Sequence, residues 1–133
     1  MKATFVRLAA EGATAKQVAD EAVLKWRELD SLLSPIIGKR GMAALYKRAL
    51  YLIRADYPWL ASAHAGEHSF GEFISLQTAL MKQTDAVALA AGLALYESFY
   101  LLLFSFIGPT LTERLLRSFH NPPSDSYAQQ DVL

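Results

Sequence analysis

The chain has 133 residues, of which 53% are hydrophobic and 20% are charged, which suffices for one domain with a hydrophobic core. Thirteen cations balance thirteen anions, which excludes a general electrostatic attraction to nucleic acid or to an anionic membrane. The chain has no cysteine, which excludes disulfides, cysteine-ligated zinc and thiol catalysis.

The first predicted helix runs from Thr14 to about Ser34. Thr14 and Gln17 have the spacing of a capping box, in which each side chain satisfies a free backbone N–H at the start of a helix. Apolar residues then recur at intervals of three or four, which is typical of an amphipathic helix with one buried face. These residues are Ala15, Val18, Ala22, Trp26, Leu29, Leu33 and Ile36.

The second predicted helix starts near Arg40 and ends before Pro58, because proline biases the preceding residue away from helical angles. Its predicted buried stripe is Met42, Leu45, Ala49, Leu52 and Ile53. A basic face projects to the opposite side, formed by Arg40, Lys47, Arg48, Tyr51 and Arg54. Such a face can bind an acidic protein partner or a small anion. A solvated outer face of a bundle explains it equally well, and we favour that interpretation.

Three further helices are predicted. The third begins at Ser69, where Glu72 completes a second capping box, and ends near Lys82 or Gln83. The fourth runs from about Thr84 to Ile107. The fifth, residues 110–119, follows a proline that suits a helix entry. Residues 121–133 are polar, and we expect a flexible tail after a single domain of residues 1–120.

The fourth predicted helix is apolar on every side, and Glu97 is the only charge between Ala86 and Ile107. Such a helix is either the centre of a bundle or a membrane span. A lone carboxylate at mid-membrane is costly, so we favour the bundle and expect Glu97 to form a salt bridge. The candidate partners are Arg48, Arg54 and Arg114. The aromatic residues of this helix are candidates for a ligand pocket or a dimer interface: Tyr96, Phe99, Tyr100 and Phe104.

A shift of seventy residues superimposes the patterns of the two long helices. Thr14 then matches Thr84, Trp26 matches Tyr96, and Ile37-Gly38 matches Ile107-Gly108. This suggests two pseudo-repeated αα-hairpins, each with a glycine joint that takes left-handed angles at little cost. The predicted fold is therefore all-α, an antiparallel bundle of four to five helices.

Two short motifs are candidate ligand sites. Lys39 and Arg40 stand in the turn Gly38–Gly41, where free backbone N–H groups and two cations suit an anion. The spacing is not that of a P-loop, and a plain joint between helices is the favoured explanation. His64 and His68 are weak candidates for a metal, because Gly66 lies between them and a helix start follows. We expect no metal and no cofactor.

No nucleophile–base pair, metal set or carboxylate dyad can be placed from spacing, which argues against an enzyme. The favoured hypothesis is a small interaction or regulatory module, homodimeric and, from its size and style alone, bacterial. One alternative is a ligand-sensing bundle that binds a small anionic or amphipathic molecule. Another is a membrane-associated protein, and nucleic acid is disfavoured as a partner.

Arg7 and Glu11 interrupt the first apolar run, so we recognise no signal peptide and expect a cytoplasmic location.

Overall fold

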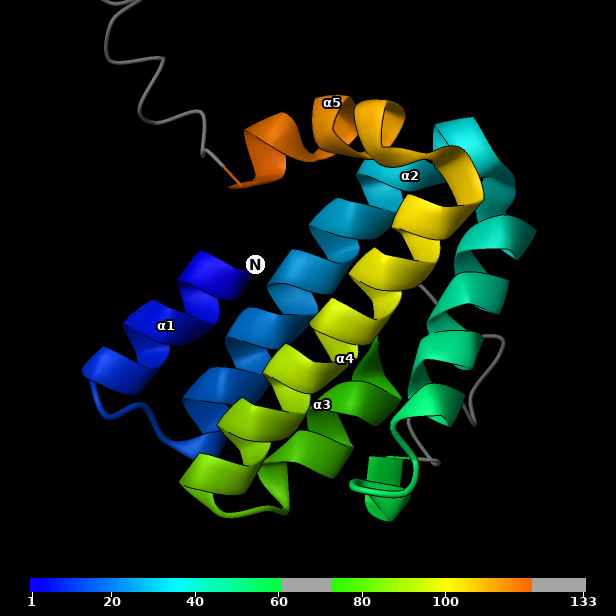
Figure 1. Ribbon diagram of the computed structural model, residues 1–133. Coiled ribbons are helices and arrows are strands. Elements are labelled where there is room, and N and C mark those ends of the chain that lie inside the picture. Colours follow the sequence, from blue (N-terminus) through cyan, green and yellow to red (C-terminus); the bar gives the residue numbers. More distant parts are fainter. Residues whose placement is uncertain (61–72, 121–133) are drawn as a thin grey trace, which may run out of the picture.

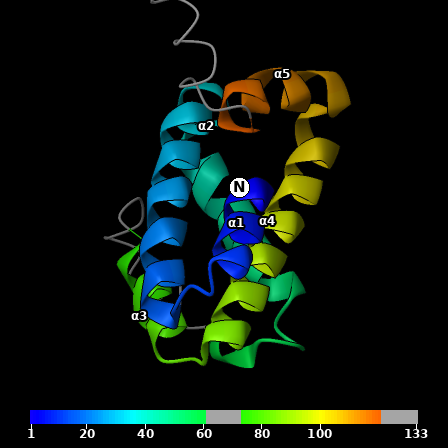
Figure 2. The same cartoon turned by 90° about the vertical axis from the view of Figure 1, so that its left-hand side faces the viewer.

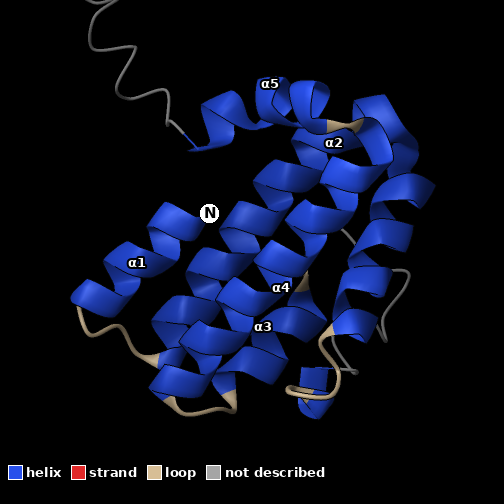
Figure 3. Ribbon diagram, viewed as in Figure 1, coloured by secondary structure: helices blue, strands red, loops and turns tan. Residues whose placement is uncertain are grey.

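The computed structural model describes residues 1–60 and 73–120, and these residues form five helices and no strand (Figure 1, Figure 3). The helices are α1 (Lys2–Ala10), α2 (Ala15–Leu52), α3 (Ile74–Met81), α4 (Asp85–Ile107) and α5 (Pro109–His120). The predicted all-α bundle is therefore confirmed. The capping box predicted at Ser69 and Glu72, both histidines of the weak metal motif and the tail 121–133 lie outside the described residues.

The N-terminal helix α1 is not among the helices predicted from the sequence. It buries Phe5 and Leu8, and Met1 just before it is buried too. These three residues are spaced by four and three, which places them on one face. A helix of nine residues is marginal by itself, so its packing on the bundle must decide whether it forms. That packing is mainly against α4 rather than against α2, which follows it in the chain.

The long helix α2 is bent at Gly38, where φ is 83° and ψ is 157°. It therefore consists of two helical segments, residues 15–37 and 39–52, joined at the predicted glycine. The first segment starts at the predicted capping box. Thr14 Oγ1 accepts from the backbone N of Gln17 at 3.2 Å, and Gln17 Oε1 accepts from the backbone N of Thr14 at 2.8 Å.

The backbone supports the repeat of seventy residues. Thr84 caps α4 as Thr14 caps α2, since its Oγ1 accepts from the backbone N of Val87 at 3.2 Å. Gly108 ends α4 at φ 87° and ψ 162°, close to the angles of Gly38. Both members of eight pairs separated by seventy are buried: Val18/Ala88, Ala22/Gly92, Trp26/Tyr96, Leu29/Phe99, Leu33/Leu103, Met42/Thr112, Tyr46/Leu116 and Ala49/Phe119.

The first segment of α2 and the whole of α4 lie side by side and run in the same direction (Figure 1, Figure 2). Their first turns meet, because the backbone N of Ala15 donates to Asp85 Oδ1 at 2.7 Å. The returning segments supply the antiparallel neighbours. Residues 39–52 run back along α4, and Ser98 Oγ donates to the carbonyl O of Ala49 at 3.1 Å. Each short helix packs mainly on the long helix that does not follow it in the chain. α1 precedes α2 but packs on α4, and α3 precedes α4 but packs on α2.

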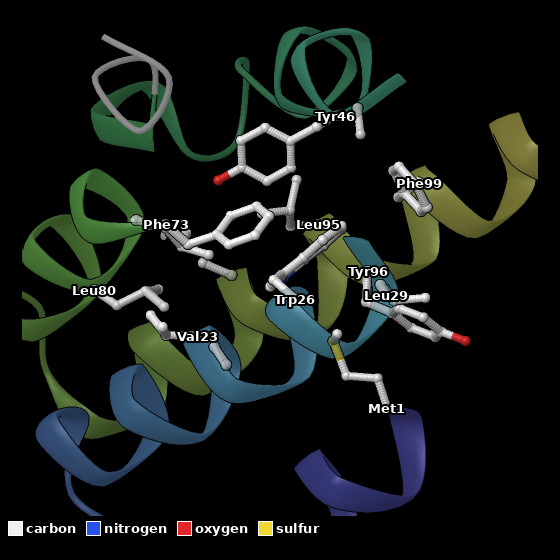
Figure 4. Close-up of a cluster of buried hydrophobic side chains, with 14 of the residues drawn as sticks. Met1, Val23, Trp26, Leu29, Tyr46, Phe73, Leu80, Leu95, Tyr96 and Phe99 are labelled. Atoms are coloured by element: carbon white, nitrogen blue, oxygen red, sulfur yellow. The ribbon is translucent and has the colours of Figure 1, made fainter. Parts of the chain in front are cut away.

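Aromatic side chains fill the centre of the bundle (Figure 4). The ring of Trp26 lies 5.1 Å from Tyr46, 5.9 Å from Phe73 and 5.0 Å from Phe99, measured between centroids. All four residues are buried. Phe73 adopts a left-handed backbone with φ 57°, which costs a non-glycine residue about 1–3 kcal/mol. Burial of its ring against Trp26 and Tyr46 offsets that cost.

The two joints predict matched effects of substitution. No atom lies within 4 Å of a Cβ added to Gly38 or to Gly108, so alanine there would suffer only from the positive φ. We expect Gly38→Ala and Gly108→Ala each to lower the free energy of unfolding by about 1–3 kcal/mol. Gly41→Ala, in a helix and with ordinary contacts to Ile37, should not destabilise the protein, because alanine favours the helix. Urea denaturation measures all three, and equal values for the three variants would contradict the prediction.

Candidate functional site

A groove of about 960 Å³ lies between α1 and α4. Most of its surface is apolar, and its size is that of a small-molecule site. One wall comes from α1 with Met1, and the other from the middle of α4. The lining residues are Met1, Lys2, Ala3, Val6 and Arg7 on one side and Tyr96, Glu97, Tyr100 and Leu101 on the other.

The surroundings of Trp26 and of Tyr96 differ between the two halves of the repeat. On the other side of the bundle, Phe73 at the start of α3 fills the space beside Trp26 and Tyr46. The position seventy residues before Phe73 is Ala3 of α1, which has no ring. Leu116 of α5 takes the place of Tyr46. The rings around Tyr96 also differ, since Phe119 of α5, at the position that corresponds to Ala49, lies 6.3 Å from Tyr96 between centroids.

Close packing at one point holds the two walls together. Phe5 of α1 is buried against Gly92 of α4, and a Cβ added to this glycine would lie 2.8 Å from Phe5 Cε1. The position seventy residues earlier is Ala22, which is also small. A residue without a side chain at 92 therefore allows α1 to approach α4 closely enough to form a groove.

The charges at the groove differ in how they are paired. Arg7 is engaged within the chain, since its Nη1 lies 3.3 Å from Glu11 Oε1 and its Nη2 lies 3.7 Å from Glu21 Oε1. Lys2 and Glu97 are exposed, and neither has an ion pair with any residue in the described ranges. The groove thus offers one unpaired charge of each sign, on opposite walls.

The salt bridge expected for Glu97 is not formed with Arg48, Arg54 or Arg114 in the part of the chain that the structure describes. The direction of the side chains gives the reason. Ser98, the next residue, faces residues 39–52 through its bond to Ala49. Glu97 points instead to the groove and to solvent, so its charge stays hydrated without a partner.

The tyrosines of α4 form the aromatic part of the groove. The rings of Tyr96 and Tyr100 lie 6.1 Å apart between centroids, and those of Tyr100 and Phe104 are also 6.1 Å apart. Burial raises the pKa of Tyr96 well above its ordinary value, and the neighbouring Tyr100 and Glu97 raise it further. The Tyr96 hydroxyl therefore stays protonated at every physiological pH.

The four aromatic residues predicted as a pocket or interface separate into different places. Tyr96 and Tyr100 line the groove, and Phe104 is half-buried beside them. Phe99 is a core residue that contacts Trp26, and it offers no surface to a second chain. The α1 wall of the groove was missed because α1 itself was not predicted. The spacing of Met1, Phe5 and Leu8 is the signal that could have revealed it.

The basic face of residues 39–54 lies on another part of the surface. The Tyr51 ring has Arg54 Cζ at 3.6 Å and Arg48 Cζ at 5.2 Å from its centroid. Arg54 Nη1 also donates to the carbonyl O of Tyr51 at 2.8 Å. Arg40 and Lys47 are exposed on the same helical segment. The predicted residues of this face are therefore together, and an aromatic ring holds two of them.

Lys39 behaves differently from the other cations of the predicted anion site. Its Nζ lies 3.5 Å from Oδ2 of Asp30, which is buried, and Ser34 Oγ donates to Asp30 Oδ1 at 2.7 Å. The lysine thus bridges the joint from the second helical segment to the first. This contact supports the interpretation of the glycine turn as a joint. Among the described residues no group of three or more His, Asp or Glu could hold a metal ion.

The helix α4 is the one described helix that is long and apolar enough to cross a membrane. Its most apolar window has a mean hydropathy of 1.8, and 39% of that window is buried in the structure. Its outer side carries Leu101 and Phe106, which are 64% and 63% exposed. α4 is therefore both a core helix and an apolar surface.

The contact between Phe5 and Gly92 predicts the effect of Gly92→Ala. The added methyl group would overlap the buried Phe5 ring, so we expect a loss of about 1–3 kcal/mol in the free energy of unfolding. We also expect faster hydrogen exchange in α1 than in the rest of the bundle. Phe5→Leu should cost less in the Gly92→Ala background than in the wild type, because the smaller side chain makes room. Additive effects would contradict this close packing.

No family model, no curated protein and no solved structure matches the chain. We therefore infer its function from the groove and from the basic face, using the contacts and charges of their residues.

Proposed function

We propose that this protein is a small non-enzymatic binding module, and that the groove between α1 and α4 holds an amphipathic molecule. The observation that supports this proposal is the groove itself, whose apolar lining and volume of about 960 Å³ suit a small ligand. Each CH₂ group buried there would contribute about 0.8 kcal/mol.

The two kinds of lining residue suit the two parts of such a ligand. Val6 and Leu101 are 58% and 64% exposed, so a ligand would cover apolar surface that now faces water. Lys2 and Glu97 stand at the groove without ion-pair partners among the described residues. A polar head group can therefore find a charge while its chain lies on the apolar wall.

Binding at this place would also act on the fold. The helix α1 is short and lies mainly on α4, so a ligand that touches both walls stabilises the docked position of α1. A ligand of this kind raises the stability of the protein in proportion to the logarithm of its concentration. A sensing or regulatory role then follows from the position of α1.

The substitution Ala3→Trp tests the site, because Ala3 is exposed and lines the groove. An indole there should fill the groove and weaken binding at least about tenfold, which is about 1.4 kcal/mol. Isothermal titration with three amphiphiles that share a ten-carbon chain measures this: decanoate, decyltrimethylammonium and decyl maltoside, each below its micelle concentration.

The matched control is Ala9→Trp, which places the same ring on an exposed position of α1 that does not line the groove. It should bind like the wild type. Failure of all three amphiphiles to bind the wild type would refute the proposal. Equal binding by Ala3→Trp and the wild type would place the ligand elsewhere and would also refute it.

A second candidate function is self-association, which the exposed apolar side of α4 favours. Phe106 is 63% exposed and does not line the groove. Large apolar side chains exposed to water mark interaction sites when they gather in patches, and homodimers are the commonest assembly.

The substitution Phe106→Glu tests self-association separately from ligand binding. Because Phe106 is largely exposed, the variant should fold and show the same helix content by circular dichroism. We expect the wild type to be a dimer by light scattering without detergent, and the variant to be a monomer. Leu24→Glu, at a position 52% exposed on α2, should remain a dimer. A wild type that is monomeric at every concentration would contradict this candidate.

A further inference from the structure

Some cations of the described residues have a carboxylate partner and others do not. Arg7, Lys16, Lys25 and Lys39 each lie within 4.0 Å of a carboxylate oxygen. Four cations on residues 40–54 have no such partner in the described ranges, and we call them the basic strip: Arg40, Lys47, Arg48 and Arg54. The only acid from position 39 to position 60 is Asp56, which is exposed and pairs with none of them. The strip therefore carries an unbalanced positive charge.

The spacing of the strip is regular. Arg40, Lys47 and Arg54 are seven residues apart in the sequence, and for Arg40 and Lys47 this is two turns of the helix, about 10.5 Å along its axis. The first two lie on the exposed side of the segment 39–52. Arg54 follows the end of that helix, yet its position is fixed, because it stacks on the Tyr51 ring at 3.6 Å and donates to Tyr51 O. The strip thus has Arg40 and Lys47 on the helix, with Arg54 and Arg48 at the Tyr51 ring.

Stacking prepares the arginines for a carboxylate. A guanidinium over an aromatic ring can present N–H groups at its edge to the oxygens of a carboxylate. Arg54 uses an Nη1 donor on Tyr51 O, which leaves its other N–H groups for a ligand. The side chain has already lost part of its freedom, so less entropy is lost on binding. Tyr51 as a residue remains 49% exposed and offers apolar contact next to the charges. Ala44, exposed between Arg40 and Lys47, allows a close approach of another backbone.

We propose that the basic strip docks an acidic helix of another protein, one that carries Asp or Glu at every seventh position. Two helices packed side by side have the same rise per residue, so carboxylates with this period meet successive cations of the strip. Nucleic acid fits less well, because the chain has no net positive charge and the strip is one helix wide. This surface is distinct from the groove, which other helices form, and its role does not depend on the groove.

The test uses the full chain and a labelled alanine-rich helical peptide of about 20 residues with Glu at every seventh position, long enough for three contacts. Fluorescence anisotropy at low salt measures its dissociation constant. We expect binding at least about tenfold tighter than to a peptide of the same composition with Glu at every fifth position. Added salt should weaken it. Lys47→Glu should weaken it at least about tenfold, and Tyr51→Leu should also weaken it by releasing both arginines.

Lys82→Glu is the matched control, since Lys82 is exposed and lies outside the strip. It makes the same change of charge and should leave the dissociation constant unchanged. Circular dichroism and thermal melting establish that each variant is folded. The proposal is overturned if the two peptides bind equally, if a single-stranded oligonucleotide binds as tightly as the first peptide, or if no peptide binds. It is also overturned if Lys82→Glu weakens binding as much as Lys47→Glu does.

Discussion

The Trp26 ring meets the Phe99 ring edge-on at 5.0 Å, between the two long parallel helices, and the other elements of the bundle are placed around this contact. Tyr46 reaches it from residues 39–52, and Phe73 reaches it from the start of α3. Four segments that are distant in the sequence thus share one buried cluster. Large aromatic side chains bury more apolar surface than any others, and edge-to-face contacts add a smaller directional term. The relative positions of α2, α4 and the start of α3 follow from the need to cover these rings.

The repeat gives the two halves of the bundle the same backbone, while their side chains give them different roles. Threonine caps, glycine joints and buried positions recur at a separation of seventy. Trp26 is surrounded by the aromatic rings of Tyr46, Phe73 and Phe99. Tyr96, its counterpart, lies against Phe119 and lines the groove that α1 and α4 form. The candidate binding site therefore belongs to one copy of the repeated core only.

The two candidate surfaces use different physical chemistry. The groove between α1 and α4 is concave and mainly apolar, so burial of a ligand would supply most of its affinity. The basic strip is exposed and charged, so it would provide orientation and speed of association more than affinity. Lys39 belongs to neither, because Asp30 holds it at the joint. If both proposals hold, a small ligand on α1 and α4 and an acidic helix on residues 40–54 can bind the same molecule without sharing a residue.

The sequence alone was enough to predict the elements whose signals are local. Thr84 begins α4 and Gly108 ends it, at the positions that capping and glycine chemistry predict. The exposed basic face of residues 39–54 follows equally from helical periodicity. The start of α3 could not be predicted in this way, because Phe73 takes its left-handed backbone only where Trp26 and Tyr46 bury its ring.

Tertiary structure alone decided three features of the candidate site. The helix α1 exists because Phe5 finds the side-chain-free surface of Gly92, which is 87 positions away in the chain, as their numbers show. The Phe99 side chain lies in the core and the Glu97 side chain lines the groove, although both belong to the same apolar helix. The long helices run parallel because returning segments lie between them in the chain. Capping and periodicity depend on residues within about one or two turns, whereas a groove depends on which distant faces meet, and a local pattern does not contain that information.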